Sequence, residues 1–489
     1  MIGIISDRII LMSTKNIAEP SCRNILRLCM DIDYRKKVVL YNIGSDDKIS
    51  DFIEYVMKIF PYNPNGGNST VNVLRGVNGN YYHVTVTNNH GGKLIIREMS
   101  NIVPTSLDDI MVKFPAKTIE ESCLKCAKIL KDMDLSGNTI GAMSLANFRS
   151  GFGYAKYFDK FPKLDKTIVS DMHSAYMGGF MMALPGEYHH VVDYDCNSLY
   201  PYMLAHYPTP YGEPLPYDGP YVDDDSYPAH IDVMIFRADL KTDGFPFLTY
   251  NQHSWLDDSS RLISTHGYIT MALTDVDQKL LKENYDVSVY KNVKGWKFRQ
   301  SQGFFYEWVN SWGGVKETSV GGVRYIVKLL MNSLVGKFGA YSRGKRLEPE
   351  VVDGVLTWSV VSDEEPFVSS YPPVSMFVTA HARRYLINAM RSQKAGRVVY
   401  ANTDGFMVAY EDGDVVSSLD IDDTELGKWK IEAEYDKVVI VRTGLYQGLK
   451  AYGGVDLISS GITRTTPIPW TDVPKGSMVV DDNGSTIML

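Results

Sequence analysis

The chain has 489 residues, of which 44% are hydrophobic and 22% are charged. This composition is typical of a soluble globular protein with about three to five packed units, which excludes a disordered, collagenous or coiled-coil chain. Lys and Arg total 50 against 58 for Asp and Glu, giving a formal net charge of −8. That balance excludes a strongly basic nucleic-acid coat protein, but it permits an enzyme that holds nucleic acid in a local basic groove.

The sequence predicts neither a membrane span nor a secretory signal. No apolar run reaches the ~18–20 residues that cross a bilayer, and Asp7 and Arg8 interrupt the apolar start of the chain. The five cysteines are few and odd in number, which is typical of free thiols in a reducing compartment. Cys123 and Cys126 form a Cys-x-x-Cys pair, but no second pair stands at a spacing that suits zinc, and we interpret them as helix thiols.

The first part of the chain, to about residue 165, is predicted to be a mixed α/β domain. Strands are expected at 38–41, 71–74 and 82–86, where β-branched and apolar residues cluster. Helices are expected at 51–60, which carries an apolar stripe at helical spacing, and at 118–133.

The pattern changes after Tyr200. Five prolines within 207–225 predict that regular structure stops there, and strand-like and helical segments resume over 229–300. Beyond these, the sequence predicts a helix at 322–337, a polar surface insertion at 340–365, a helix at 379–394 and a strand–turn–strand at 397–410.

Two acids stand at the end of one predicted strand. Asp193 and Asp195 lie in the segment 191–201, and the two-residue period of a strand places both side chains on one face. An isolated Asp-x-Asp pair is most often only two acids at a strand end, here followed by Pro201. Taken alone, the pair does not define a site.

A predicted helix carries a column of polar side chains. Arg324, Lys328 and Asn332 are spaced four apart, so they stack along one helix face and could hold an anion such as phosphate. The segment 316–346 contains seven basic residues against the single acid Glu317, in a chain whose net charge is negative. A solvated basic helix face is the alternative explanation.

The third segment is Asn402–Gly405, which lies between two apolar strands. Asp-Gly is a strong hairpin-turn signal by itself, and a functional interpretation places Asp404 at the hairpin tip, where it can bind a cation. A strand-end carboxylate, a cationic helix and a hairpin-tip carboxylate are together the parts that nucleotidyl transfer needs. Two carboxylates can hold paired Mg²⁺ ions, and the helix can hold a triphosphate in line.

These segments resemble the motifs of the family-B DNA polymerases, and most closely those of the protein-primed branch of bacteriophages. The matches run in the family's order from about residue 171 to residue 462. They comprise Tyr176–Gly179 (the motif linking exonuclease and polymerase domains), Asp195–Pro201 (motif A), Lys328–Gly336 (motif B), Thr379–Arg383 (a template- and primer-contacting motif) and Tyr400–Gly405 (motif C).

The resemblance implies an α/β (α+β multidomain) fold, namely a right-hand polymerase with palm, fingers and a short thumb, preceded by a degenerate RNase H-like exonuclease domain. It implies an exonuclease-like domain at 1–170, palm at 171–206 and 372–462, fingers at 304–339, terminal-protein-region insertions at 207–303 and 340–371, and a short thumb at 463–489. In the protein-primed branch, insertions at these two places contact a terminal protein and encircle DNA.

The resemblance also implies residue roles. Asp195 and Asp404 would hold two Mg²⁺ ions, with Mn²⁺ as an alternative, and the backbone carbonyl of Cys196 would be a further ligand. Tyr200 would exclude a 2′-hydroxyl, and the residues implied as triphosphate contacts are Lys316, Lys328 and Asn332. The residues implied as DNA contacts are Tyr176, Gly178, Gly179, Ser198, Gly336, Thr379, Arg383, Thr403, Arg442 and Tyr446.

The implied partners are a DNA primer–template, dNTPs and a terminal protein whose hydroxyl side chain receives the first nucleotide. The enzyme would act in the cytoplasm of a bacterial host, without a membrane, as a monomer or as a heterodimer with the terminal protein. By the same resemblance it would displace the non-template strand without a helicase.

Several residues depart from the family pattern. Asn402 replaces the first aspartate of motif C, Val335 replaces a motif B tyrosine, and Gly444 stands where a primer-binding lysine is expected. The first change predicts an altered metal requirement and the second predicts reduced fidelity. Up to residue 170 the chain also lacks the Asp-x-Glu and Tyr-x-x-x-Asp motifs of a proofreading nuclease, so we predict that 3′–5′ activity is absent.

Two other functions are open on sequence alone. A catalytically degenerate polymerase kept as a DNA-binding or replication-assembly scaffold would account for Asn402, Val335 and Gly444. A two-carboxylate hydrolase could use Asp195 with another acid, but it leaves the basic helix column unexplained.

Overall fold

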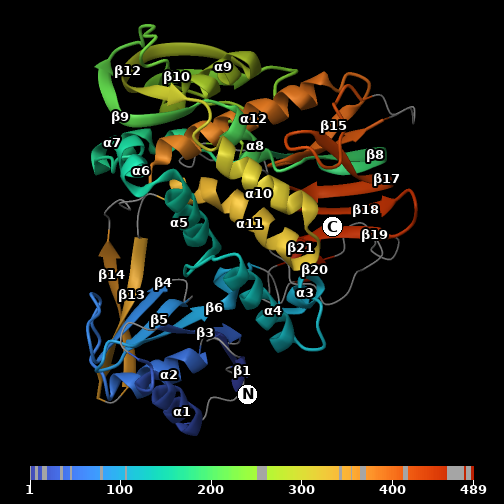
Figure 1. The fold of residues 1–489 in the computed structure, drawn as a ribbon. Helices are drawn as coiled ribbons and strands as arrows, with labels where there is room; N and C mark the ends of the chain where they lie inside the picture. Colours follow the sequence, from blue (N-terminus) through green and yellow to red (C-terminus); the bar gives the residue numbers. More distant parts are fainter. Residues whose placement is uncertain are drawn as a thin grey trace. The chain divides into compact units, whose positions relative to one another are not determined.

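The computed structural model describes residues 2–5, 9–13, 19–33, 37–43, 47–76, 81–104, 107–249, 261–340, 344–353, 355–363, 370–410, 417–459, 478–480 and 486–488. They form two compact units, and both are discontinuous in sequence (Figure 1). The first unit consists of Met1–Lys166 and Asn310–Tyr371, and the second consists of Thr167–Val309 and Pro372–Leu489.

The first unit is built on a mixed sheet of eight strands within the described residues. The strands lie in the order β1 (Ile2–Ile5), β2 (Ile9–Ser13), β3 (Lys37–Ile43), β6 (Lys93–Glu98), β5 (Tyr81–Thr87), β4 (Thr70–Gly76), β13 (Gly344–Val352) and β14 (Val355–Asp363). Only β3 runs parallel to its neighbours, β2 and β6. Figure 1 shows the β13–β14 hairpin beside strands from the start of the chain, and Arg346 and Leu347 pair with Gly76 and Arg75.

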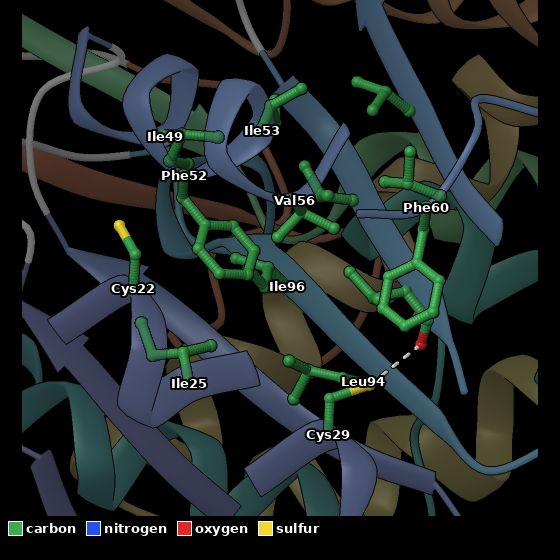
Figure 2. Packing of buried hydrophobic residues seen from close by; sticks show 14 of the residues in the cluster. Cys22, Ile25, Cys29, Ile49, Phe52, Ile53, Val56, Phe60, Leu94 and Ile96 are labelled. Atoms are coloured by element: carbon green, nitrogen blue, oxygen red, sulfur yellow. Dashed lines mark hydrogen bonds between the residues drawn. The ribbon is translucent and has the colours of Figure 1, made fainter. Parts of the chain in front are cut away.

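Two helices, α1 (Glu19–Met30) and α2 (Asp47–Met57), bury apolar faces in the core of this unit. Phe52, Ile53 and Val56 recur at helical spacing on α2 and are fully buried. Figure 2 shows side chains of both helices gathered with Leu94 and Ile96 of β6. The sheet and these helices therefore share one hydrophobic core.

The remaining helices of the first unit include the predicted basic helix. They are η2 (Met99–Asn101), α3 (Leu107–Lys113), α4 (Ile119–Asp132), α5 (Ile140–Phe152), α6 (Tyr154–Lys160) and α11 (Gly321–Phe338), with α10 (Tyr306–Thr318) crossing the unit boundary in sequence. The Ser144 hydroxyl of α5 donates a hydrogen bond of 2.7 Å to the Leu330 carbonyl of α11. Phe338 at the end of α11 packs edge-on against Phe148 and Phe161. These contacts hold α11 against α5.

The second unit contains an antiparallel sheet of seven strands within the described residues. The strands lie in the order β19 (Val455–Ser459), β18 (Leu445–Lys450), β17 (Trp429–Arg442), β8 (Gly186–Cys196), β16 (Gly405–Ala409), β15 (Arg397–Asn402) and β7 (Met181–Ala183). Two helices of this unit are α8 (Leu199–His206) and α12 (Pro372–Ser392). The long strands β8 and β17 pair over most of their length and form the centre of the sheet.

A second antiparallel sheet occupies the segment predicted as the first insertion. Its order is β11 (Ile269–Thr274), β10 (Ala229–Leu240), β12 (Tyr285–Ser301) and β9 (Thr209–Asp218), and nearby elements are α7 (Lys166–Met172), η3 (His173–Ala175) and α9 (Asp275–Asn284). The prediction that regular structure stops over 207–225 is therefore wrong, because β9 forms despite Pro210, Pro214 and Pro216. It lies at the edge of the sheet, where proline is tolerated because its missing N–H faces away from the ladder.

Most predicted elements are confirmed. The helices expected at 51–60, 118–133, 322–337 and 379–394 are α2, α4, α11 and α12, and the strands expected in the first part are β3, β4 and β5. The predicted insertion at 340–365 forms the β13–β14 hairpin of the first unit's sheet. Most of the predicted thumb lies outside the described residues, apart from β20 (Met478–Val480) and β21 (Thr486–Met488). Within the described part of the chain, no helix has the length and apolar character required to cross a membrane.

Candidate active site

The end of β8 carries the first predicted carboxylate. Asp195 is the next-to-last residue of the strand, and the chain leaves the strand direction at Ser198, which has a left-handed φ of 53° and caps α8. Tyr200, in the first turn of α8, is mostly enclosed, and burial raises its pKa to about 12. Asp195 and Tyr200 are thus placed on either side of one sharp turn.

The β15–β16 hairpin carries the second carboxylate. Its two-residue turn is Thr403–Asp404, and Thr403 has a left-handed φ of 60°. Gly405 pairs directly with Asp195 across β16 and β8, and the Cys196 N–H donates to the Asp404 carbonyl at 2.8 Å. The structure therefore places Asp195 and Asp404 at adjoining strand ends, although they are far apart in sequence.

The motif predicted to link two domains lies against the β15–β16 hairpin. The Thr403 N–H donates to the Phe180 carbonyl at 2.7 Å. A Cβ built on Gly179 would lie 2.9 Å from the Thr403 hydroxyl and 3.0 Å from the Tyr200 hydroxyl, so only glycine fits without displacement. Segments containing the first, second and last of the five sequence motifs thus meet at one place in the second unit.

A lysine that the sequence analysis did not single out also lies at this place. Lys430 of β17 pairs in register with Asp195, and its ammonium is 3.2 Å from Asp195 Oδ2. The same ammonium forms an ion pair with Glu432. Burial opposes the charged form, but the hydrogen bond to Glu432 and the charge of Asp195 outweigh it and raise the pKa of Lys430.

Two buried arginines donate hydrogen bonds to backbone carbonyls of the segment that contains Gly178 and Gly179. Arg261 is 1% exposed and donates to the carbonyls of Gly179, Met181 and Phe247 at 2.7, 3.1 and 2.9 Å. Arg383 is fully buried and donates to the Gly178 carbonyl at 2.5 Å. These bonds turn the carbonyls of Gly178 and Gly179 inward.

Two predicted DNA contacts, Arg383 and Thr379, lie in buried positions. Arg383 forms a bidentate ion pair with Asp277 of α9, with N–O distances of 2.8 Å, and both side chains have no exposed area. Thr379 is 3% exposed, and its hydroxyl donates to the Met376 carbonyl of its own helix. Both side chains therefore serve the packing of α12 in this structure, and their contact with DNA stays a prediction.

The other predicted DNA contacts in this unit lie on separate elements. Tyr176 is largely enclosed beside Arg383 and Ser375, and burial raises its pKa. Arg442 at the end of β17 donates to the Thr443 carbonyl at 2.9 Å. Tyr446 of β18 is 8% exposed and packs edge-on against Tyr400 with ring centroids 5.1 Å apart. DNA contact by these residues stays a prediction.

Asp193 shares the face of β8 that carries Asp195. Burial raises the pKa of Asp193 to about 8, and the charge of Asp195 adds to the effect. The pKa values of Tyr446 and Tyr435 are raised in part by the charge of Asp193, which places the carboxyl near these tyrosines. Asp193 is thus an acid whose proton is retained in the folded protein near neutral pH.

The predicted basic column is confirmed as a helical feature of the first unit. Arg324 and Lys328 are exposed on α11, Asn332 is partly exposed, and Gly336 is exposed one turn later. Lys316, near the end of α10, is 8% exposed, and its carbonyl accepts a hydrogen bond of 3.0 Å from Arg324. Their contact with a triphosphate stays a prediction.

The two carboxylates fit a magnesium-type cation. Within the described residues no group of three or more His, Cys, Asp or Glu side chains is arranged as a metal cage. Mg²⁺, however, is usually held by one or two carboxylates together with water and substrate phosphates. Burial first, and then the charges of Asp195 and Asp404, raise the pKa of the Cys196 thiol, so both carboxylates act on the residue that follows β8's Asp195.

The sequence analysis missed Lys430, Arg261 and Asp277. Lys430 and Glu432 lie two positions apart in sequence, but only the register of β17 reveals that Lys430 meets Asp195. Arg261 and Asp277 carry no local signal, because their partners are distant in sequence and a buried charge looks like a surface charge in a single sequence.

Comparison with known proteins identifies the chain's relatives. Residues 106–347 match the family model described as DNA polymerase type B, organellar and viral. The chain is 30% identical over 314 residues to a DNA polymerase of Bacillus phage phi29, an alignment that covers 63% of this chain and 54% of the relative. It is 30% identical over 266 residues to a DNA polymerase of Streptococcus phage Cp-1, covering 52% and 45%. By these alignments the chain spans about half the length of the curated relatives it matches.

The fold is also found among solved structures. It is similar to phi29 DNA polymerase in complex with primer-template DNA and incoming nucleotide substrates, with a TM-score of 0.82 and 21% sequence identity over 96% of this chain and 91% of that chain. A second phi29 structure, complexed with single-stranded DNA, gives a TM-score of 0.80. These likenesses confirm the predicted α/β multidomain polymerase fold.

The Arg383–Asp277 pair predicts a large effect on stability. Arg383→Leu leaves the Asp277 carboxylate buried without its counter-charge, which is expected to cost about 3–5 kcal/mol of unfolding free energy. Unfolding midpoints in urea would measure it. The matched control is Arg384→Leu, because the Arg384 side chain is partly exposed and its Nη2 lies 3.7 Å from Glu283 Oε1. Loss of this surface ion pair should cost less than about 1 kcal/mol of unfolding free energy. Equal effects of the two changes would contradict the structural role of Arg383.

Asp193 predicts a pH dependence of stability. The folded protein keeps its proton up to a pKa of about 8, whereas the unfolded chain releases it near pH ~3.9. The stabilisation from protonated Asp193 is therefore fully present at low pH. As pH rises from ~4 to 8, the free energy of unfolding falls by up to ~1.4 kcal/mol per pH unit. Asp193→Asn should become increasingly more stable than wild type between pH 5 and pH 7 in thermal unfolding. A constant difference over that range would show that Asp193 ionises normally.

Proposed function

We propose that the chain is a type B DNA polymerase of the protein-primed phage branch, which its match to the family model and to phage DNA polymerases supports, and that it adds deoxynucleotides to a primer 3′-hydroxyl under the direction of a DNA template. The observation that carries the proposal is the pairing of Gly405 with Asp195, which brings Asp195 and Asp404 to adjoining strand ends. Two oxygen ligands at one edge of a sheet suit a phosphoryl-transfer metal site.

In this proposal the metal site is formed by Asp195, Asp404 and the carbonyl of Cys196. Polymerases of this family depend on divalent metal, and we assign two Mg²⁺ ions, with Mn²⁺ as an alternative. The chemistry supplied by bound Mg²⁺ is a lower pKa for the attacking hydroxyl and neutralisation of the pyrophosphate that leaves. The protein's own part is to hold the two carboxylates in place through the β8–β16 register.

The remaining roles concern substrate selection. Tyr200 places its hydroxyl beside Gly179, and we assign it to the exclusion of a 2′-hydroxyl. The exposed Lys328 and the partly exposed Asn332 of α11 are assigned to the triphosphate, which cationic and amide donors bind by charge-assisted hydrogen bonds. Lys316 is assigned as a further phosphate contact. Gly178 and Gly179, with their carbonyls turned inward, are assigned to the DNA backbone.

Protein priming is proposed from the branch to which we assign the chain. The partner would be a terminal protein that provides the first hydroxyl, and the segments 207–303 and 340–371 would contact it. In the structure these segments form the sheet β11-β10-β12-β9 and the β13–β14 hairpin. The setting would be the cytoplasm of a bacterial host, with the enzyme acting as a monomer or as a heterodimer with its terminal protein.

Asp404 provides the direct test of the polymerase proposal. Asp404→Ala should lower dNTP incorporation on a primed template by more than about 100-fold, because even residues that only support metal ligands are worth about 10–100-fold. Primer–template binding, measured by gel shift, should change little. The control Asp420→Ala removes a well-exposed acid of the same unit that pairs with Lys428 and should keep incorporation. Absence of product from wild type with both Mg²⁺ and Mn²⁺ would favour the scaffold function instead.

Loss of proofreading is tested separately. A 3′-labelled single strand should survive incubation with wild-type enzyme and Mg²⁺, because the segment up to residue 170 lacks the Asp-x-Glu and Tyr-x-x-x-Asp carboxylates of a family nuclease. The Asp404→Ala variant should behave identically. Degradation that disappears when acids of the first 170 residues are replaced would overturn this part of the proposal.

A further inference from the structure

One row of side chains crosses the seven-stranded sheet at the proposed metal site. Lys430 of β17 pairs with Asp195 of β8, Asp195 pairs with Gly405 of β16, and Gly405 pairs with Asn402 of β15. Residues paired in this way project from the same face of an antiparallel sheet. The row therefore presents, in order, a cation, a carboxylate, a gap where glycine has no side chain, and an amide.

Lys430 has two carboxylates within reach of its ammonium. Asp195 Oδ2 is 3.2 Å away on the neighbouring strand, and Glu432, two residues further along β17 at an irregularity in its pairing with β8, forms an ion pair with the same ammonium. The side chain of Glu432 is 54% exposed, whereas that of Asp195 is 28% exposed. The ammonium thus stands between an inner carboxylate, assigned to metal, and an outer one that faces water.

A divalent ion and this ammonium compete for the same oxygen atoms. Both carry positive charge, and charges a few ångströms apart in a partly enclosed site repel strongly. A metal that binds Asp195 must therefore act against Lys430 or displace it. Glu432 offers the displaced ammonium a partner that it already contacts, so the displacement requires a side-chain shift and no movement of the strand.

The amide of Asn402, at the other end of the row, increases the effect of Lys430 on metal binding at Asp195. Asn402 contributes no negative charge, so the site has two carboxylates assigned as metal ligands, Asp195 and Asp404, and Lys430 pairs with one of them. With fewer negative charges to attract the ion, the position of a single ammonium has a proportionally larger effect on metal affinity.

We propose that Lys430 is a positioning residue that pairs with Asp195 in the metal-free protein and transfers to Glu432 when a divalent cation binds, so that Lys430 sets the metal concentration the site requires. The inference rests on the proposed function only in taking Asp195 as a metal ligand. It assigns Lys430 and Glu432 opposite effects on the same equilibrium, which a purely structural role would not produce.

The test measures metal binding by the whole protein in the absence of DNA and nucleotide. Mn²⁺ is titrated into the protein and free Mn²⁺ is followed by electron paramagnetic resonance, with the signal of Asp195→Asn subtracted as the contribution of other sites. Lys430→Met should bind Mn²⁺ roughly tenfold more tightly, because a neighbouring positive charge is removed. Glu432→Gln should bind it roughly threefold more weakly, because the displaced ammonium loses its alternative partner.

The matched control comes from the same pair of strands. Lys437 of β17 forms an ion pair of 2.7 Å with Glu187 of β8, so Lys437→Met removes an equivalent cross-strand pair away from the row. It should leave the Mn²⁺ affinity unchanged. Unfolding midpoints of all variants verify that they are folded, and Glu432→Gln, which alters a well-exposed side chain, keeps the test available if Lys430→Met is unstable.

The outcomes separate this inference from the proposed function. Unchanged affinity in Lys430→Met, or tighter binding in Glu432→Gln, overturns the role of Lys430 even if the enzyme polymerises DNA. The expected opposite shifts support it even if primer extension fails. In an active enzyme the Mg²⁺ concentration for half-maximal extension should shift in the same directions as the Mn²⁺ affinities, and shifts in the contrary directions would also overturn it.

Discussion

The register between β8 and β16 is the constraint on which the site depends. Gly405 is opposite Asp195, and each further step along the two strands keeps the next pair aligned up to Ala409 and Val191. Side chains alternate between faces, so a slip of one residue would send Asp195 to the opposite face of the sheet and separate it from Asp404. Phe406–Ala409 of β16 are buried without alternation, so both faces of this strand are packed and the same slip would also disrupt the core on both sides of the sheet.

Charged groups in the interior of the second unit are arranged around backbone carbonyls. Arg261 and Arg383 both direct their guanidinium groups at the short segment that precedes β7, and Asp277 neutralises one of them. A guanidinium is always charged and has several fixed donors, so it can orient several carbonyls at once where a lysine could not. The segment beside Thr403 is thereby held by side chains that come from the β-rich insertion and from α12.

The sequence predicted local elements well and long-range partners poorly, because a local pattern does not show which distant residue a side chain meets. The Asp404 hairpin and the α11 column follow from short-range patterns, namely a turn dipeptide and a spacing of four. The strand β9 was missed because its prolines are acceptable only at a sheet edge, and edge position is a property of the assembled sheet. Arg383 was predicted as a DNA contact, and its burial could not be predicted because burial of a charge depends on a partner, Asp277, that lies 106 positions away. Lys430 was missed for the same reason, since its significance appears only when the register of β17 is known.

The pairing of β13 with β4 has a consequence for how the protein can be divided. An expression fragment that stops near residue 166 would keep β4 but lose the hairpin that covers it. The fragment would then leave the backbone of Arg75 and Gly76 without the partners that β13 provides in the intact chain, and an unpaired strand edge is a template for intermolecular strand association. The amino-terminal portion is therefore poorly suited to isolation as a soluble module, and biochemical dissection of its properties is better done by point substitution within the intact polypeptide.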